Sequence, residues 1–135
     1  MTLTFIDSGV LIAAARGADS VSSKAQAVLT DASRQFVSSD LVRLEVLPKP
    51  IYFKRTAEVA YYQAFFAIVL DWVSVTPAVI QLALQRASEF GLGAMDALHV
   101  ATAELAHAQA LVTSERQNSP ICRMTSISVI SRQAL

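Results

Sequence analysis

The sequence predicts an α/β protein: a three-layer α/β/α sandwich with a mostly parallel central sheet. Short apolar runs of strand length alternate with longer segments that carry apolar residues at helical spacing. Strands joined by helices pair in parallel through right-handed crossovers, which place helices on both faces of the sheet. The length of 135 residues fits one such unit, so we expect a single domain over residues 1–135.

The expected strands are short and apolar, and they cover residues 3–6, 35–38, 72–75, 110–113 and 127–130. The expected helices cover residues 9–15, 20–32, 40–47, 55–70, 77–90 and 94–107. Pro48 and Pro50 are expected to end the helix that precedes them, because proline disrupts a helix interior. Thr76 suits the cap and Pro77 the first position of the helix expected over residues 77–90, and Gly91 suits its end.

The composition is unusually apolar, with 53% hydrophobic and 16% charged residues. The longest apolar stretch, Val59–Leu70, is too short to span a membrane, which takes about 20 residues. The apolar surplus favours a self-association surface or a partner-binding groove. The first residues lack the features of a signal peptide, and the single Cys122 excludes an internal disulfide, so we expect a cytoplasmic protein.

Eleven basic and eleven acidic residues cancel, which argues against tight nonspecific binding of nucleic acid. The basic residues are nevertheless unevenly spread. Four of them fall within thirteen residues in which Glu45 is the only acid: Arg43, Lys49, Lys54 and Arg55. They are candidates for contacting a phosphate backbone, and a solvated surface is the alternative interpretation.

Four acidic residues follow expected strands or begin expected helices. Asp7 comes directly after the first strand, and Glu45 lies on the helix after the second. Glu115 comes two residues after Thr113, at the end of a later strand. Ligands of open parallel sheets bind outside the carboxyl ends of the strands, so these three are expected at one rim. Asp96 joins them if its helix starts at the same edge.

Carboxylates gathered at one rim repel one another unless a cation compensates their charge. Oxygen ligands of this kind suit Mg²⁺ or Mn²⁺, which can activate water for phosphodiester hydrolysis. Taken alone, Asp7 is better explained as a helix cap, and Asp96 is explained equally well as a carboxylate that stabilises a helix dipole. The prediction of a metal site therefore depends on the four residues together.

Four segments resemble the motifs of the PIN-domain family. Residues 5–12 (Phe-Ile-Asp-Ser-Gly-Val-Leu-Ile) are similar to its opening strand and helix, and residues 38–46 to its second motif, a short helix that bears a Glu. Residues 94–103 (Ala-Met-Asp-Ala-Leu-His-Val-Ala-Thr-Ala) resemble the third motif, and residues 111–115 the fourth. Glu115 departs from the pattern, since Asp or Asn is commoner at that position.

Within that family, chains of this size resemble the VapC-type toxins of toxin–antitoxin pairs. The resemblance implies an endoribonuclease that hydrolyses RNA phosphodiester bonds with Mg²⁺ or Mn²⁺, forms a homodimer and is restrained by an antitoxin protein. It implies that the metal is held by Asp7, Glu45, Asp96 and Glu115. Three further residues are expected to support these carboxylates: Ser8, Thr113 and Asn118.

Other functions remain open at this point. A catalytically degenerate binding protein on the same fold, or a phosphohydrolase that acts on small phosphate esters, would carry much of the same pattern. Metal-dependent cleavage of RNA separates both from a ribonuclease.

Overall fold

The computed structural model describes residues 1–17 and 19–135. Its strands are β1 (Thr2–Ile6), β2 (Arg34–Ser39), β3 (Asp71–Val73), β4 (Ala110–Val112) and β5 (Ser128–Ile130). They form one five-stranded sheet in the order β3-β2-β1-β4-β5, and every neighbouring pair is parallel. The α/β class expected from the sequence is confirmed.

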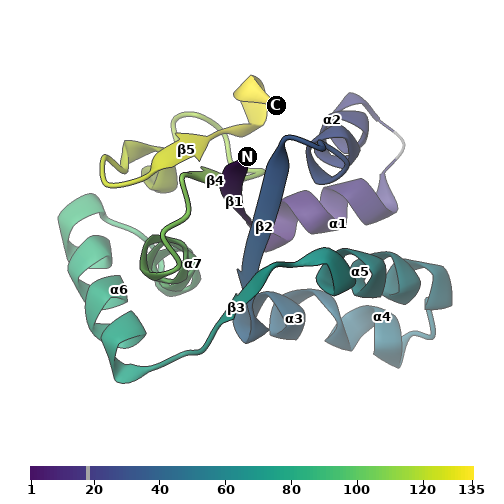
Figure 1. Ribbon diagram of the computed structural model, residues 1–135, viewed down its shortest axis with the longest axis horizontal. Coiled ribbons are helices and arrows are strands. Elements are labelled where there is room, and N and C mark those ends of the chain that lie inside the picture. Colours follow the sequence, from purple (N-terminus) through teal and green to yellow (C-terminus); the bar gives the residue numbers. More distant parts are fainter. Residues whose placement is uncertain (18) are drawn as a thin grey trace.

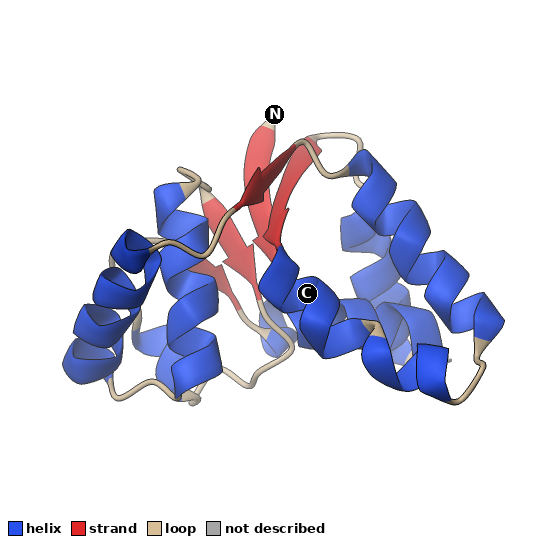
Figure 2. Ribbon diagram, turned by 90° about the horizontal axis from the view of Figure 1, so that it is seen from below, coloured by secondary structure: helices blue, strands red, loops and turns tan. Residues whose placement is uncertain are grey.

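Helices cover both faces of the sheet. They are α1 (Ser8–Arg16), α2 (Ser20–Leu29), α3 (Asp40–Val46), α4 (Pro48–Tyr52), α5 (Thr56–Ile68), α6 (Pro77–Phe90) and α7 (Ala94–Leu105), with 3₁₀ turns η1 (Pro120–Arg123) and η2 (Arg132–Ala134). Figures 1 and 2 show α1 to α5 on one side of the strands, with α6 and α7 on the other. The molecule therefore has the three layers that the sequence predicts. In the part of the chain that the structure describes, no helix is long and apolar enough to cross a membrane.

The expectation that Pro48 and Pro50 follow the end of a helix is confirmed, but the sequence predicts no helix between residues 47 and 55, and this is wrong. The α3 helix ends at Val46, but Pro48 begins the short helix α4. Proline is well tolerated in the first turn of a helix, where its missing N–H has no partner to lose. A second difference is that α2 ends at Leu29 rather than at residue 32, because the Asp31 side chain accepts a hydrogen bond from the Ser33 N–H at 2.9 Å and turns the chain.

The α6 helix begins and ends where its sequence signals predict. The Thr76 side chain accepts a hydrogen bond from the Val79 N–H at 3.4 Å, and Pro77 takes the first helical position. Gly91 ends the helix with a φ of +69°, a left-handed conformation that glycine adopts without steric cost.

The middle of the sheet is buried on both faces. Phe5 in β1 pairs in register with Val37 of β2 and Leu111 of β4, so the three side chains share one face, and none has exposed surface. Thr4 and Ile6 point to the other face and are 0% and 1% exposed. The chain leaves β1 towards β2 on one side and returns to β4 on the other. This reversal makes the carboxyl ends of β1 and β4 a topological switch point, where open α/β sheets form their crevices.

Candidate functional site

Asp7 lies at the carboxyl end of β1, with only 8% of its surface exposed. It caps α1, because its Oδ1 accepts a hydrogen bond from the Gly9 N–H at 3.3 Å. Its Oδ2 accepts a second one from the Thr113 hydroxyl at 2.8 Å. The capping role foreseen for Asp7 is therefore real. It also fixes the carboxylate at the switch point, so capping and a role in a site are compatible.

Glu45 extends from α3 towards the ends of β1 and α7. Its Oε1 accepts a hydrogen bond from the Ser8 hydroxyl at 2.6 Å and lies 2.5 Å from Nε2 of His99. The hydrogen bond from His99 lowers the pKa of the Glu45 carboxyl, Ser8 adds to the effect, and burial opposes it. Glu45 is thus held in its charged form although much of its side chain is shielded from water.

Asp96 lies in the first turn of α7 and is half-buried. Burial raises the pKa of its carboxyl, and the negative charges of Asp7 and Glu115, and more weakly Glu45, raise it further. These interactions place the start of α7 at the same edge as the other three carboxylates. Among the described residues, the Asp96 side chain accepts no hydrogen bond and forms no ion pair, and the charge of His99, which lowers the pKa, offsets only part of the repulsion.

Glu115 is exposed on the loop after β4. Its backbone N–H donates to the Thr113 hydroxyl at 3.1 Å, and its Oε2 accepts from the Ser119 hydroxyl at 3.2 Å. The loop packs closely on the start of α1: a Cβ added at Gly9 would lie 2.1 Å from the Ser114 Oγ. The third of the expected supporting residues, Asn118, is exposed and makes no side-chain hydrogen bond within the described part of the chain. Ser119 is the polar neighbour of Glu115 instead.

The donor atoms at this edge suit a hard divalent cation in chemistry and charge. They are carboxylate oxygens, and the charged form of Asp96 is destabilised by its acidic neighbours. The spacing is wider than in a filled metal centre: over residues 1–17 and 19–135, no three His, Cys, Asp or Glu side chains come close enough together to hold an ion. The carboxylates would have to draw together to share one cation.

The four basic residues singled out in the sequence have different surroundings. Arg43 stacks on the Trp72 indole, with its Cζ 3.8 Å from the ring centre, and Arg55 lies 5.5 Å from the Phe53 ring centre. Lys54 borders an apolar hollow between α4 and α5. Of the four, Lys49 alone lines the same hollow as Glu45.

That hollow, of about 300 Å³, adds a cation that sequence reasoning missed. Arg16, the last residue of α1, lines it with Glu45, Lys49 and Tyr62. Its Nε pairs with Glu58 at 3.0 Å, and 44% of its side chain is exposed. The sequence around Arg16 does not indicate that it lies near Glu45, because the two residues come together only when α1 and α3 pack against each other.

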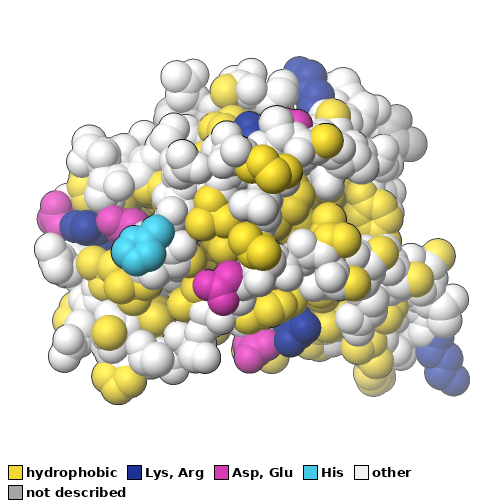
Figure 3. Space-filling model, viewed as in Figure 1, with side chains coloured by type: hydrophobic (Ala, Val, Ile, Leu, Met, Phe, Trp, Pro, Cys, Tyr) yellow, Lys and Arg dark blue, Asp and Glu magenta, His cyan; other side chains and the backbone are white. Residues whose placement is uncertain are grey.

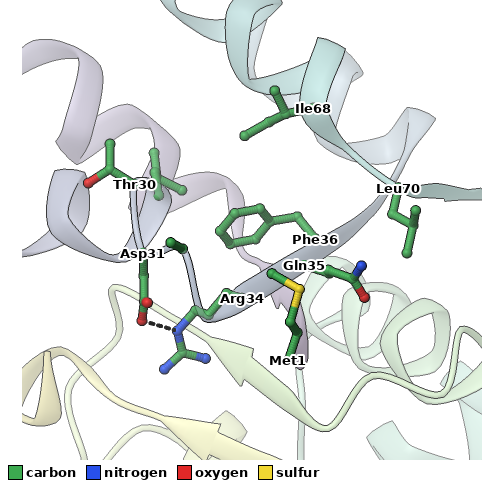
Figure 4. Close-up of a pocket in the computed structure, with 10 residues that line it drawn as sticks. Met1, Thr30, Asp31, Arg34, Gln35, Phe36, Ile68 and Leu70 are labelled. Carbon is green, nitrogen blue, oxygen red and sulfur yellow. Dashed lines mark ion pairs between the residues drawn. The ribbon is translucent and has the colours of Figure 1, made fainter.

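A larger hollow, of about 510 Å³, lies away from the carboxylates. Met1, Arg34, Phe36 and Leu70 surround it, and Figure 4 shows them around the start of β2. Arg34 pairs there with Asp31 at 3.4 Å. This is the amino edge of the sheet, whereas parallel sheets bind ligands at the carboxyl edge, so we place the candidate site at the carboxylates despite the smaller hollow.

Comparisons with solved structures find this fold among bacterial toxin–antitoxin proteins. A chain of VapBC2 from Rickettsia felis, bound to a fragment of promoter DNA, matches with a TM-score of 0.72 and 13% identity over 96% of this chain and 98% of that one. A toxin–antitoxin complex from Klebsiella pneumoniae matches with a TM-score of 0.69 and 16% identity over 96% and 97%. VapC20 of Mycobacterium tuberculosis, a toxin that cleaves the sarcin–ricin loop, matches with a TM-score of 0.60 and 20% identity over 80% and 86%.

These identities are low, so the structural matches establish the fold alone. No curated protein matches the sequence. The model of the PIN domain family, however, matches residues 4–122, a range that contains all four carboxylates. This match covers most of the sequence, and the switch-point site lies where the motifs of that family were identified. The chain therefore belongs to the PIN domain family.

Proposed function

We propose that this protein is a single-domain, metal-dependent endoribonuclease that acts in the cytoplasm as the toxin of a toxin–antitoxin pair. One observation carries the proposal: the charges of Asp7, Glu45 and Glu115 all act on Asp96 at the carboxyl edge of the sheet. Clustered carboxylates that repel one another are costly in a folded protein, and a bound cation removes that cost. Membership of the PIN family and the fold shared with VapC proteins support the assignment.

In this proposal Asp7, Glu45 and Asp96 hold Mg²⁺ or Mn²⁺, and Glu115 completes the set or orients the attacking water. Such an ion activates water and stabilises the negative charge that develops at phosphorus. The chain supplies orientation: Thr113 fixes the Asp7 carboxylate and Ser8 fixes that of Glu45. Lys49 and Arg16 line the hollow beside Glu45, and in this proposal they contact the RNA backbone there.

An antitoxin partner and a homodimer belong to the same proposal. The structural matches include solved toxin–antitoxin complexes. On the face seen in Figure 3, apolar side chains far outnumber charged ones. Around α3 and α4, Leu44, Tyr52 and Phe53 are 68%, 78% and 58% exposed, which is unusual for large apolar side chains in a monomer. Burial of these residues against another chain would remove that exposure.

The test is cleavage of several structured RNAs by the purified protein with Mg²⁺ or Mn²⁺. We expect cleavage that EDTA abolishes and that Asp96→Asn reduces by at least about a hundredfold. The matched control is Asp71→Asn, since Asp71 is an exposed carboxylate at the start of β3, the outer strand that β2 separates from β1. Equal loss in both variants would contradict the assignment.

Two outcomes would favour the competing functions. If the protein hydrolyses a small phosphate ester and no RNA, it is a phosphohydrolase of another kind. If it binds RNA or a partner protein and hydrolyses neither substrate with any metal, it is a binding protein on the PIN fold.

A further inference from the structure

His99 is buried beside the candidate site, with 2% of its surface exposed. It lies on α7 three residues after Asp96, so the two side chains share one face of the helix. Its Nε2 lies 2.5 Å from the Oε1 of Glu45, a residue of α3. The α7 helix therefore carries the candidate metal ligand Asp96 and, through His99, also contacts the candidate ligand Glu45 on α3.

The contact falls on only one of the two Glu45 oxygens. Oε1 receives both the His99 ring nitrogen and the Ser8 hydroxyl, at 2.5 and 2.6 Å. Two donors use both lone pairs of that oxygen. Within the described residues, Oε2 accepts no hydrogen bond. The pair of donors thus fixes the rotation of the carboxylate and leaves Oε2 as the atom free to bind a ligand.

Packing alone does not account for a histidine at this position. The ring packs against Phe5, with ring centres 5.6 Å apart, as an apolar side chain could. Its Nδ1 is buried and has no hydrogen-bond partner among the described residues. Burying an unpaired polar atom costs free energy, and among the residues that the structure describes the hydrogen bond to Glu45 is the one polar contact of the ring that offsets the cost.

We propose that His99 is a positioning residue for metal binding: with Ser8, it holds Oε1 of Glu45, so that Oε2 would be the oxygen available to a bound ion. It also couples the α7 helix, which carries Asp96, to α3. This inference rests on the proposed function in one respect, that Glu45 is a metal ligand. Histidine–carboxylate contacts behind a metal ligand orient the ligand, and their loss typically weakens metal affinity by about 10–100-fold.

The test compares His99→Gln with His99→Met, which are nearly equal in size. The Gln side chain can place an N–H donor where Nε2 stands, and the Met side chain has no donor. We expect calorimetric titration of the purified chain with Mn²⁺ to show at least about tenfold weaker binding for His99→Met. His99→Gln should stay within about threefold of the unsubstituted protein. Equal Mn²⁺ affinities of His99→Met and the unsubstituted protein would overturn the inference.

Two further variants separate positioning from general destabilisation. Phe5→Leu disturbs the packing around the same ring and leaves the hydrogen bond in place, so it should lower the melting temperature without weakening Mn²⁺ binding tenfold. In a Glu45→Ala background, His99→Met should have no further effect on Mn²⁺ affinity, because the residue through which it acts is gone. An additive effect in the double variant would show that His99 does not act through Glu45.

These measurements also distinguish the inference from the proposed function. If the Met and Gln variants differ as expected in Mn²⁺ affinity but no RNA is cleaved, the inference stands and the ribonuclease assignment fails. If the protein cleaves RNA with Mn²⁺ and His99→Met binds Mn²⁺ normally, the inference alone fails. If the unsubstituted protein binds no Mn²⁺, both are wrong.

Discussion

The Thr113 hydroxyl joins the ends of β1 and β4 by donating a hydrogen bond to Asp7 Oδ2 at 2.8 Å. The same hydroxyl accepts the Glu115 N–H at 3.1 Å. One fully buried oxygen thus orients a candidate metal ligand and fixes the backbone of another. The switch point of the sheet is held together by a side chain as well as by the ladder of backbone hydrogen bonds.

Thr113→Val should destabilise the fold and weaken the site. Valine has the shape of threonine but cannot donate, so it leaves a buried Asp7 oxygen unpaired, at a cost of about 1–3 kcal/mol. Urea unfolding should show this loss, and Mn²⁺ affinity should fall with it. Thr113→Ser keeps the hydroxyl and is the control. Equal stability of the Val and Ser variants would contradict a role for this hydrogen bond.

Asp96→Asn should stabilise the metal-free protein while it removes activity. The pKa of Asp96 is raised in the fold, by burial first and by Asp7 and Glu115 next, so its ionisation costs more free energy in the folded chain than in the unfolded one. While Asp96 is protonated it does not destabilise the folded protein. As the pH rises from about 3.8, the ordinary pKa of the group, through its higher pKa in the folded protein, this part of the stability is lost. At pH 7 we expect the variant to melt on the order of a few degrees above the unsubstituted protein.

Calorimetry with EDTA present at several pH values is the appropriate measurement for Asp96→Asn. The two melting temperatures should converge near pH 3, where Asp96 is protonated in both states. A variant that melts lower at pH 7 than the unsubstituted protein would show that Asp96 is not strained by its neighbours.

Lys49 and Lys54 offer a matched comparison for RNA binding. Only Lys49 lines the hollow beside Glu45, whereas Lys54 borders the apolar hollow between α4 and α5. Lys49→Gln should weaken binding of a single-stranded RNA several-fold and reduce the salt dependence by about 0.7 in log–log slope, the value for one lost phosphate contact. Lys54→Gln should change neither. Fluorescence anisotropy at several salt concentrations measures both quantities, and equal losses would place the RNA elsewhere.

Arg86 braces α7 against α6 through a two-pronged contact with Glu104. Its Nε and Nη2 lie 2.9 and 3.0 Å from the two Glu104 oxygens, and only 17% and 13% of the two side chains are exposed. Arg86→Met leaves the Glu104 carboxylate shielded and unpaired, and should cost about 2 kcal/mol in urea unfolding. Adding Glu104→Gln should recover part of that loss. A double variant less stable than Arg86→Met would contradict this account of the pair.

The strand-end carboxylates could be located from sequence because their positions follow from local periodicity. A short apolar run predicts a strand, the parallel topology gathers the strand ends, and Asp7 and Glu115 follow such runs directly. Thr76, Pro77 and Gly91 carry local conformational signals, so the bounds of α6 were predictable to the residue. The α4 helix was missed because a proline signals both the end of one helix and the start of another.

Contacts between distant elements left no comparable signal. Within its own helix His99 is an ordinary residue, and its bond to Glu45 spans 54 positions. The stacking of Arg43 on Trp72 joins α3 to β3 in the same way. Such pairings depend on how the layers pack, which the spacing of residues along one element does not encode.

The strand order also sets the sequence of events during synthesis on the ribosome. β1 can pair with β2 early, but its other edge stays unpaired until β4 has been made, and Thr113 lies 106 residues after Asp7. Pairing at such separation is slow relative to local contacts. In a nascent chain the residues of the α1–α5 layer are therefore made before Thr113 can fix Asp7, so the candidate site is completed late in synthesis.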